Sequence, residues 1–233
     1  MSDAKEVKIP IEHEWDAYDS KHTDSSVPYR EAVGNLTFLQ VVSRPDIAFA
    51  LNVASRALDN PTKAHWNLVK RIIRYVKGTT DYGIVYGANN QFKTFSDADY
   101  AGDKETRKST TGVVCMYGGA AISWQSTKQQ CVAVSTTEAE YVSAAAAARK
   151  NVWVMRLLRE LDVSVSENIL YIDNQSALRL VKNPEFHKRS KHIDVKYHFV
   201  RDLYEKGEIN VCYVKTEEQL ADIFTKVLNV KRF

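Results

Sequence analysis

Apolar residues recur with helical spacing across residues 28–77. They form three successive runs: Tyr29, Val33, Leu36, Leu39 and Val42; Ile47, Leu51, Ala54 and Leu58; and Trp66, Val69, Ile72, Ile73 and Val76. A spacing of three or four residues places such side chains on one face of an α-helix. Pro45 and Pro61 stand at the starts of the second and third runs, where a helix tolerates proline. The pattern predicts three short helices.

Beyond the turn signal Gly87-Ala88-Asn89-Asn90, the pattern changes to that of strands. Residues 92–96, 112–117 and 121–128 are predicted to form a meander of three strands, in which Gly118-Gly119 makes a hairpin turn. Ser135 then has the character of a helix N-cap, with Glu138 three residues later. It opens an alanine-rich helix that is predicted to run to about Leu161.

The rest of the chain alternates between short strands and helices. Predicted are a strand at 169–172, a helix at 175–181 before Asn183-Pro184, a basic helix at 190–206 before Gly207, a strand at 209–214 and a last helix at 218–228. This order of elements predicts an α/β domain, with a mixed sheet flanked by helices. The small helical domain precedes it, and the turn at 87–90 is the predicted boundary.

The composition is that of a globular protein. The chain has 233 residues, 44% of them hydrophobic, and a formal charge of +3. It has no apolar run near the roughly 18 residues of a membrane span, and it begins with charged residues, so neither a membrane anchor nor secretion is expected. The three cysteines lie far apart and form no C-x-x-C pair, which argues against a disulfide framework and a zinc ribbon.

Basic residues are concentrated near the C-terminus. Residues 182–206 hold seven basic and four acidic side chains. The same segment contains Phe186, Tyr197, Phe199 and Tyr204. Cations interleaved with aromatic rings suit a nucleic-acid backbone, but a solvated amphipathic helix has the same composition. Charge by itself leaves both interpretations open.

Six acids lie where strand or helix ends could bring them together: Asp97, Asp99, Glu138, Glu140, Asp173 and Asp222. Converging carboxylates repel one another, so such a cluster normally holds a hard divalent cation such as Mg²⁺. Each acid also has a simpler explanation, as a turn residue, as a favourable charge at a helix N-terminus or as a solvated side chain. Their large separations in sequence mean that only the fold can unite them.

Six motifs run in order through the second part of the chain. They are Ser96-Asp97-Ala98-Asp99-Tyr100-Ala101-Gly102-Asp103, Arg107-Lys108-Ser109-Thr110-Thr111-Gly112, Ser135-Thr136-Thr137-Glu138-Ala139-Glu140-Tyr141, Asp173-Asn174-Gln175-Ser176-Ala177, Lys191-His192-Ile193-Asp194 and Ala221-Asp222-Ile223-Phe224-Thr225-Lys226. Together they resemble the ribonuclease H domain of copia-type LTR retrotransposon Pol polyproteins. Residues 28–86, with Ser43-Arg44-Pro45-Asp46-Ile47, resemble the segment that joins the reverse transcriptase to that domain.

The resemblance implies a ribonuclease H-like, mixed five-stranded sheet flanked by helices. It divides the chain into an extended leader (1–27), a helical connection segment of the reverse transcriptase (28–90) and a ribonuclease H-like domain (91–230). The implied partners are an RNA–DNA hybrid and the polymerase part of the same polyprotein. The implied location is a virus-like particle in the cytoplasm, or the nucleus.

The resemblance also implies a catalytic set of four acids, Asp97, Glu140, Asp173 and Asp222, that binds two Mg²⁺ ions, with Mn²⁺ as a possible substitute. Glu140 is preferred to Glu138, which is better explained by helix capping, although helical periodicity permits either. Asp99 and Asp103 have no role in the family pattern.

Contacts to the substrate are expected from polar residues after Asp173, from candidates for phosphate at 107–109 and from the pair at 191–192. They are Arg107, Lys108, Ser109, Asn174, Gln175, Ser176, Lys191 and His192. Ordinary loop and cap polarity explains the same residues. Residues 215–218 lack the histidine that many cellular ribonucleases H carry before the last helix, and His192 or His198 are the candidates to replace it.

Two other functions remain open from the sequence. A catalytically inactive remnant that still binds nucleic acid would keep the fold and the basic helix. Alternatively, a partner surface is formed by Trp66, Leu68, Val69, Ile72 and Ile73, although a small internal core packed on the second domain is the simpler explanation of these residues.

Overall fold

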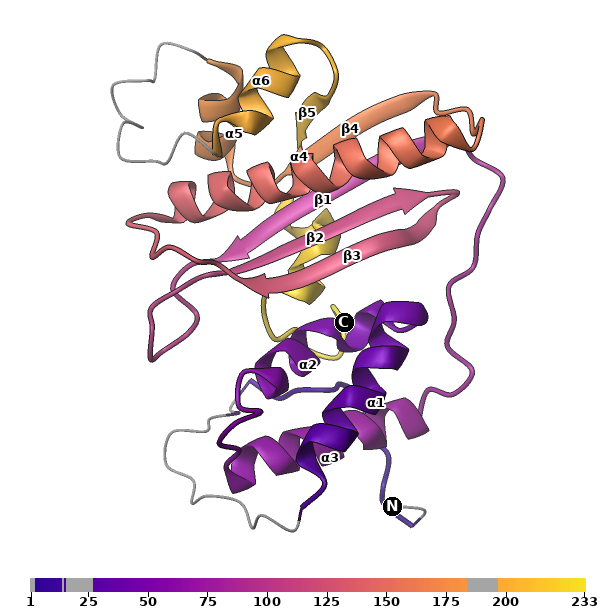
Figure 1. Cartoon of the computed structure of the whole chain (residues 1–233), viewed down its shortest axis with the longest axis vertical. Coiled ribbons are helices and arrows are strands. Elements are labelled where there is room, and N and C mark those ends of the chain that lie inside the picture. Colours follow the sequence, from indigo (N-terminus) through magenta and orange to yellow (C-terminus); the bar gives the residue numbers. More distant parts are fainter. Residues whose placement is uncertain (1–2, 14, 16–26, 184–196) are drawn as a thin grey trace. The chain divides into compact units, whose positions relative to one another are not determined.

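The computed structural model describes residues 3–13, 15, 27–183 and 197–233 (Figure 1). The chain divides into two compact units, Met1–Ile84 with Val227–Phe233, and Val85–Lys226. The first unit therefore includes the last seven residues of the chain as well as its beginning. The division into leader, connection segment and ribonuclease H-like domain stays a prediction.

The first unit contains the three predicted helices, α1 (Tyr29–Val42), α2 (Ala48–Ser55) and α3 (Lys63–Lys77). Pro45 opens a 3₁₀ turn, η1 (Pro45–Ile47), directly before α2. Thr62 caps α3 by accepting a hydrogen bond from the backbone N–H of His65, and the His65 side chain accepts one from the N–H of Thr62. A histidine thus completes a capping box in which Glu or Gln is usual.

The apolar faces of these helices form the core of the first unit. Leu68, Val69 and Ile72 of α3 are fully buried there, and Trp66 and Ile73 pack against the same core at its edge. The interpretation of these residues as an internal core is therefore confirmed over that of a partner surface.

Arg44 ties the start of η1 to the end of α3. Its guanidinium is buried, forms an ion pair of 2.8 Å with Asp46 and donates hydrogen bonds to the carbonyl and hydroxyl oxygens of Thr79. The Tyr75 hydroxyl donates a further hydrogen bond of 2.6 Å to the same aspartate. The motif around Arg44 thus has a structural role in this unit.

The second unit is built on a mixed five-stranded sheet of order β3-β2-β1-β4-β5. Its strands are β1 (Gln91–Asp99), β2 (Thr110–Tyr117), β3 (Ala120–Lys128), β4 (Glu167–Ile172) and β5 (Asn210–Tyr213). The central strand β1 pairs antiparallel with β2 and parallel with β4. The predicted α/β class, a mixed sheet flanked by helices after a small helical unit, is confirmed.

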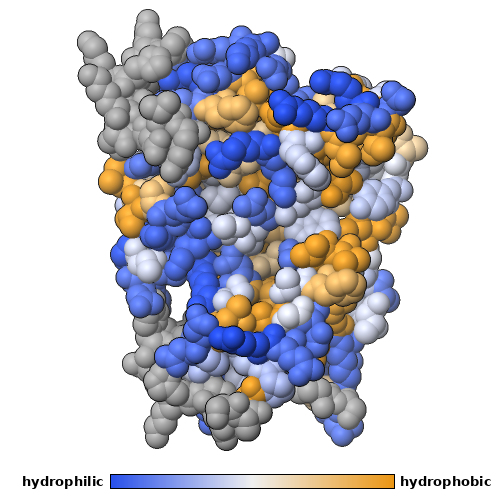
Figure 2. Space-filling model, viewed as in Figure 1, coloured by the Kyte–Doolittle hydropathy of each residue, from blue (hydrophilic) through white to orange (hydrophobic). Residues whose placement is uncertain are grey.

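A long helix, α4 (Thr136–Glu160), crosses one face of this sheet (Figure 1). Ser135 caps it as predicted, by accepting a hydrogen bond from the N–H of Glu138. Ala144, Ala145, Ala147 and Ala148 are completely buried, and their small side chains let the helix lie close to the strands. On the outer side, Trp153 and Leu161 are about 60% exposed, and Figure 2 shows apolar residues gathered at this end of α4.

Two shorter helices, α5 (Gln175–Lys182) and α6 (Phe199–Glu205), pack against α4 and each other. The basic helix predicted for 190–206 is described only in its last part, as α6, because residues 184–196 lie outside the described residues. Gly207 follows α6 with a positive φ of 69°, as expected for a glycine at a helix end. Among the described residues, no helix is long and apolar enough to span a bilayer.

The prediction of a regular last helix at 218–228 was wrong. Two short 3₁₀ turns, η4 (Thr216–Glu218) and η5 (Leu220–Phe224), stand in its place, separated by Gln219 in an extended conformation. The Gln219 amide donates a hydrogen bond to the Ser96 carbonyl of β1 and accepts one from the N–H of Ala221. These tertiary contacts replace the regular backbone bonds of a longer helix.

Candidate metal centre

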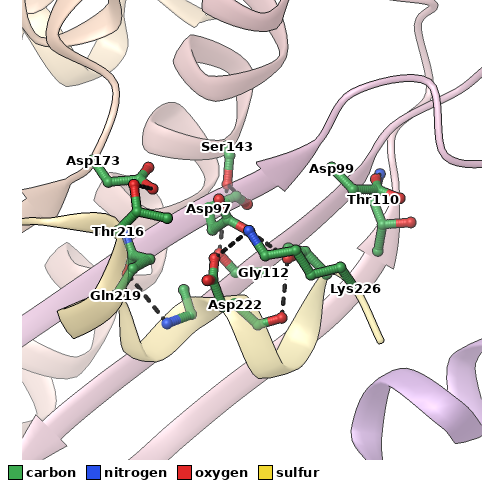
Figure 3. A network of polar contacts seen from close by, with 12 residues as sticks. Asp97, Asp99, Thr110, Gly112, Ser143, Asp173, Thr216, Gln219, Asp222 and Lys226 are labelled. Atoms are coloured by element: carbon green, nitrogen blue, oxygen red, sulfur yellow. Dashed lines mark hydrogen bonds and ion pairs between the residues drawn. The ribbon is translucent and has the colours of Figure 1, made fainter. Parts of the chain in front are cut away.

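Three of the four predicted acids converge at the carboxyl ends of the neighbouring strands β1 and β4. Asp97 lies near the end of β1, Asp173 follows β4, and Asp222 lies in η5. β1 and β4 are parallel neighbours with Ser96 opposite Ile172, so the next residues of both strands emerge together. One carboxylate oxygen from each aspartate lies within 4.8 Å of the other two (Figure 3).

Glu140 is the fourth acid, and it lies beside this group rather than within it. Its carboxylate interacts with Asp97 and Asp173 and accepts a hydrogen bond from the backbone N–H of Ala98. Burial raises the pKa of Glu140 well above its usual value, and the charges of both aspartates add to the effect. Its Oε2 is buried and has no hydrogen-bond partner within the described part of the chain.

Glu138 takes a different direction from Glu140, although it is only two residues away. Its carboxylate accepts a hydrogen bond of 2.8 Å from the backbone N–H of Val134, at the start of α4. The structure thus brings Glu140 to the aspartates and uses Glu138 to stabilise the beginning of the helix.

The clustered carboxylates share one electrostatic environment. Burial and the charge of Asp97 raise the pKa of Asp222 to about 6, and the same two causes raise the pKa of Asp173. The Lys226 ammonium opposes this repulsion, since its Nζ lies 2.6 Å from Oδ1 of Asp222 and 3.7 Å from Oδ2 of Asp97. The centre therefore carries excess negative charge in a largely buried place.

Two threonine hydroxyls orient the aspartates. Thr225 donates a short hydrogen bond to Oδ2 of Asp97, and Thr216 donates one of 3.0 Å to Oδ2 of Asp173. Behind them, the Ser143 hydroxyl of α4 donates to the Asp97 carbonyl at 2.7 Å. No sequence pattern pointed to these hydroxyls, because only the fold brings them to the acids.

The residues present fit a hard divalent cation. All donors at the centre are carboxylate oxygens, which Mg²⁺ and Mn²⁺ prefer. The buried Oε2 of Glu140 lacks a partner that a cation would supply. A positive ion would also relieve the repulsion that raises the carboxyl pKa values.

Asp99 and Asp103 shape the loop between β1 and β2. Asp99 accepts a short hydrogen bond from the backbone N–H of Thr110. Asp103 accepts a hydrogen bond of 2.8 Å from the N–H of Thr106 and pairs with Lys128 at 3.3 Å. Burial acts to raise the pKa of Asp103, but these hydrogen bonds and the lysine charge lower it to about 2. Both acids hold the loop and lie outside the cluster of three aspartates.

This loop also carries three of the predicted substrate contacts. Arg107 is exposed and has a positive φ of 55°, and Lys108 is half-buried. Ser109 is fully buried, and its hydroxyl accepts a hydrogen bond of 3.0 Å from the N–H of Ala101. Ser109 therefore has a structural contact in this conformation, whereas Arg107 is open to solvent.

Three further predicted contacts lie beside Asp173. The Asn174 side chain caps α5 by accepting a hydrogen bond of 2.9 Å from the N–H of Ala177. Gln175 and Ser176 are exposed at the first turn of that helix. Lys191 and His192 lie outside the described residues, so their predicted roles remain predictions.

His198, a candidate to replace the histidine that residues 215–218 lack, contacts Tyr141. Its Nδ1 lies 3.0 Å from the Tyr141 hydroxyl, and the two rings meet edge to face at 5.8 Å. The structure does bring the ammonium of Lys226 to the acids. Its position four residues after Asp222 is the sequence signal that points to this ion pair.

The chain is similar in sequence to polyproteins of plant transposons. It is 45% identical over 216 residues to the retrovirus-related Pol polyprotein from transposon TNT 1-94 of Nicotiana tabacum. This alignment covers 92% of this chain and 16% of the relative. It is 39% identical over 238 residues to the corresponding polyprotein from transposon RE1 of Arabidopsis thaliana, with 100% of this chain and 16% of the relative covered. The chain thus spans about one sixth of the length of these relatives. No protein-family model matches it.

Solved structures with detectable similarity include ribonuclease H1 LC11, isolated from compost, at 16% identity and a TM-score of 0.43 over 59% of this chain and 94% of that one. They also include the foamy viral protease-reverse transcriptase in complex with an RNA/DNA hybrid, at 17% identity and a TM-score of 0.47 over 86% of this chain and 26% of that one.

Proposed function

Because this chain belongs to the retrovirus-related Pol polyproteins of copia-type transposons, with a ribonuclease H-like second unit, we propose that it hydrolyses the RNA strand of RNA–DNA hybrids as a metal-dependent endonuclease. The observation that supports this most directly is the convergence of Asp97, Asp173 and Asp222, with Glu140 beside them.

Asp97, Glu140, Asp173 and Asp222 would hold the divalent ions. When bound, Mg²⁺ supplies a Lewis acid for the phosphate oxygens and lowers the pKa of a water molecule that can then attack phosphorus. The protein contributes the orientation of the ligands. Thr225 and Thr216 hold the carboxylates of Asp97 and Asp173, and Gln219 anchors the segment with Asp222 to β1.

Recognition of a hybrid needs contacts to 2′-hydroxyls on one strand and to phosphates on the other. Arg107 and Lys108 are the proposed phosphate contacts, and the exposure of Arg107 on the loop between β1 and β2 supports this assignment. Gln175 and Ser176 are the proposed sugar contacts, and their exposure two and three residues after Asp173 supports this assignment. In the polyprotein, the polymerase part would be the partner that delivers the hybrid.

The test is cleavage of a hybrid with a labelled RNA strand by the full chain, in Mg²⁺ or Mn²⁺. Single-stranded RNA and double-stranded DNA serve as competing substrates. We expect metal-dependent loss of the RNA strand of the hybrid, abolished by Asp173→Asn. Asp162→Asn is the matched control, because Asp162 is exposed after α4 with a positive φ of 52° that asparagine tolerates.

Binding of the hybrid without cleavage under either metal would overturn the proposed activity. The chain would then be a nucleic-acid-binding remnant of a Pol polyprotein. Equal loss of cleavage in both variants would remove the acidic cluster as its site.

A further inference from the structure

Lys226 occupies the position in the acidic cluster where a cation is needed. It follows η5, and its side chain reaches to the carboxylates of Asp222 and Asp97 (Figure 3). The Nζ atom lies 2.6 Å from Oδ1 of Asp222 and 3.7 Å from Oδ2 of Asp97. Asp173 also acts on the lysine electrostatically, so all three clustered aspartates interact with this ammonium.

The cluster needs such a counter-ion when no metal is bound. Asp97, Asp222 and Glu140 are almost completely buried, and burying uncompensated like charges is costly. One ammonium between two of the carboxylates reduces their repulsion. It leaves Oε2 of Glu140 without a partner, so it neutralises the cluster only in part.

The same carboxylates are the ones that would bind a divalent ion. Asp97 and Asp222 belong to the group whose oxygens lie within 4.8 Å of one another, and an ammonium beside them uses lone pairs that the ion requires. Two positive charges in one small site also repel each other. The ammonium and the metal ion therefore compete for these two aspartates.

The Lys226 ammonium group can move away from the carboxylates without a shift of η5. The Lys226 side chain is 37% exposed, and a flexible four-carbon stem carries its ammonium group. Its neighbour Thr225 is completely buried and bonds to Asp97. Thr225 and Gln219 keep η5 in place through their own hydrogen bonds. Only the ammonium has to move.

We propose that Lys226 is a positioning residue that holds the cation site closed in the metal-free protein, is displaced when a divalent ion binds, and then pairs with a phosphate of the nucleic acid. The inference rests on the proposed function for its last step. Because the phosphate gives the displaced ammonium a new partner, nucleic acid and metal ion should each strengthen the binding of the other, by the same factor.

The first test is Mn²⁺ binding to the full chain without nucleic acid, by calorimetry at pH 8.5, where competition from protons is weak. We expect Lys226→Met to bind Mn²⁺ at least about tenfold more tightly than the natural chain, because one competing charge is gone. Lys226→Arg keeps the charge and should stay within about threefold of the natural chain. Lys63→Met, at an exposed lysine of the first unit, is the control.

Unchanged or weaker Mn²⁺ binding by Lys226→Met would overturn the proposal, since the lysine would then coexist with the ion or help to hold it. Thermal unfolding gives a second readout. Without metal, Lys226→Met should unfold at a lower temperature than the natural chain, and saturating Mn²⁺ should remove this difference. A difference that persists in Mn²⁺ would also count against displacement.

The second test measures Mn²⁺ binding with and without a hybrid whose RNA strand carries 2′-O-methyl groups and resists cleavage. The hybrid should tighten Mn²⁺ binding to the natural chain several-fold more than to Lys226→Met. Equal tightening would overturn the transfer to phosphate. These results are separable from the proposed activity. If the chain cleaves the hybrid but Lys226→Met does not change Mn²⁺ binding, only this inference fails. If Lys226→Met changes Mn²⁺ binding as expected but the chain does not cleave, only the proposed nuclease activity fails.

Discussion

Gly112 lies directly opposite Asp97 in the antiparallel pair of β1 and β2, and its lack of a side chain makes room for the segment that carries Asp222. A Cβ atom at this position would lie 2.7 Å from the Ala221 carbonyl oxygen and 2.6 Å from Cγ2 of Thr225. The glycine therefore allows the segment that carries Asp222 to lie close to Asp97.

Gly112→Ala should separate Asp222 from Asp97. We expect a destabilisation of about 1–3 kcal/mol from overpacking, and a loss of hybrid cleavage of at least about tenfold, because η5 must shift away from β2. Chemical denaturation and initial cleavage rates at 20 °C measure the two effects. Gly34→Ala is the control, because that glycine lies in α1 with nothing within 4 Å of an added Cβ. Unchanged cleavage by the folded Gly112→Ala variant would show that the fit at this glycine is not needed.

Glu140→Gln and Glu138→Gln form a matched pair of substitutions two residues apart. Glu140→Gln should abolish cleavage and raise the metal-free melting temperature at pH 8, because it removes a buried acid whose charged form is disfavoured by burial and by Asp97 and Asp173. Glu138→Gln should keep cleavage and leave stability within about 1 kcal/mol, since its contact is a hydrogen bond at the helix start. The reverse result would move the metal ligand to Glu138.

The stability of the metal-free protein should fall as the pH rises from about 4 to about 6. The pKa of Asp222 is raised from 3.8 to about 6 in the folded state, so the folded protein binds this proton more tightly than the unfolded chain does. Its protonation stabilises the fold at low pH, and this contribution, about 1–3 kcal/mol, is lost as the pH passes the folded pKa. Urea denaturation in EDTA across this range measures the effect.

Asp222→Asn should flatten this pH dependence, because the substituted side chain does not titrate. Saturating Mg²⁺ should reverse it, since the ion binds the ionised carboxylates and stabilises the fold as the pH rises. Stability that rises with pH in EDTA would contradict the raised pKa.

Arg44→Met should destabilise the first unit by about 2–4 kcal/mol. The buried guanidinium pairs with Asp46 and bonds to Thr79, and its loss leaves these groups without their partner. Arg44→Lys should restore only part of the stability, because an ammonium does not reproduce the two-pronged contact. Arg30→Met is the control, at an exposed ion pair of 2.7 Å with Asp59, and should change stability by less than about 1 kcal/mol. Equal effects at both arginines would contradict the role of Arg44.

Local patterns along the chain were enough to predict most helices and strands and the family resemblance. Helical periodicity predicted α1, α2 and α3, Ser135 marked the start of α4, and the glycine pair marked the β2–β3 hairpin, because such signals depend on neighbours along the chain. The six motifs, in their order along the chain, then pointed to the three aspartates that cluster in the candidate centre.

The assembly of the candidate metal centre depends on contacts between distant parts of the chain, which no local pattern contains. The segment around Asp222 forms 3₁₀ turns instead of a helix because Gln219 and Thr225 bond to β1. Periodicity permitted either Glu138 or Glu140, and packing of α4 on the sheet directed Glu140 to the aspartates. The approach of Lys226 to Asp97 spans more than a hundred residues, and no local pattern contains it, because hydrogen bonds and charges act between neighbours in space.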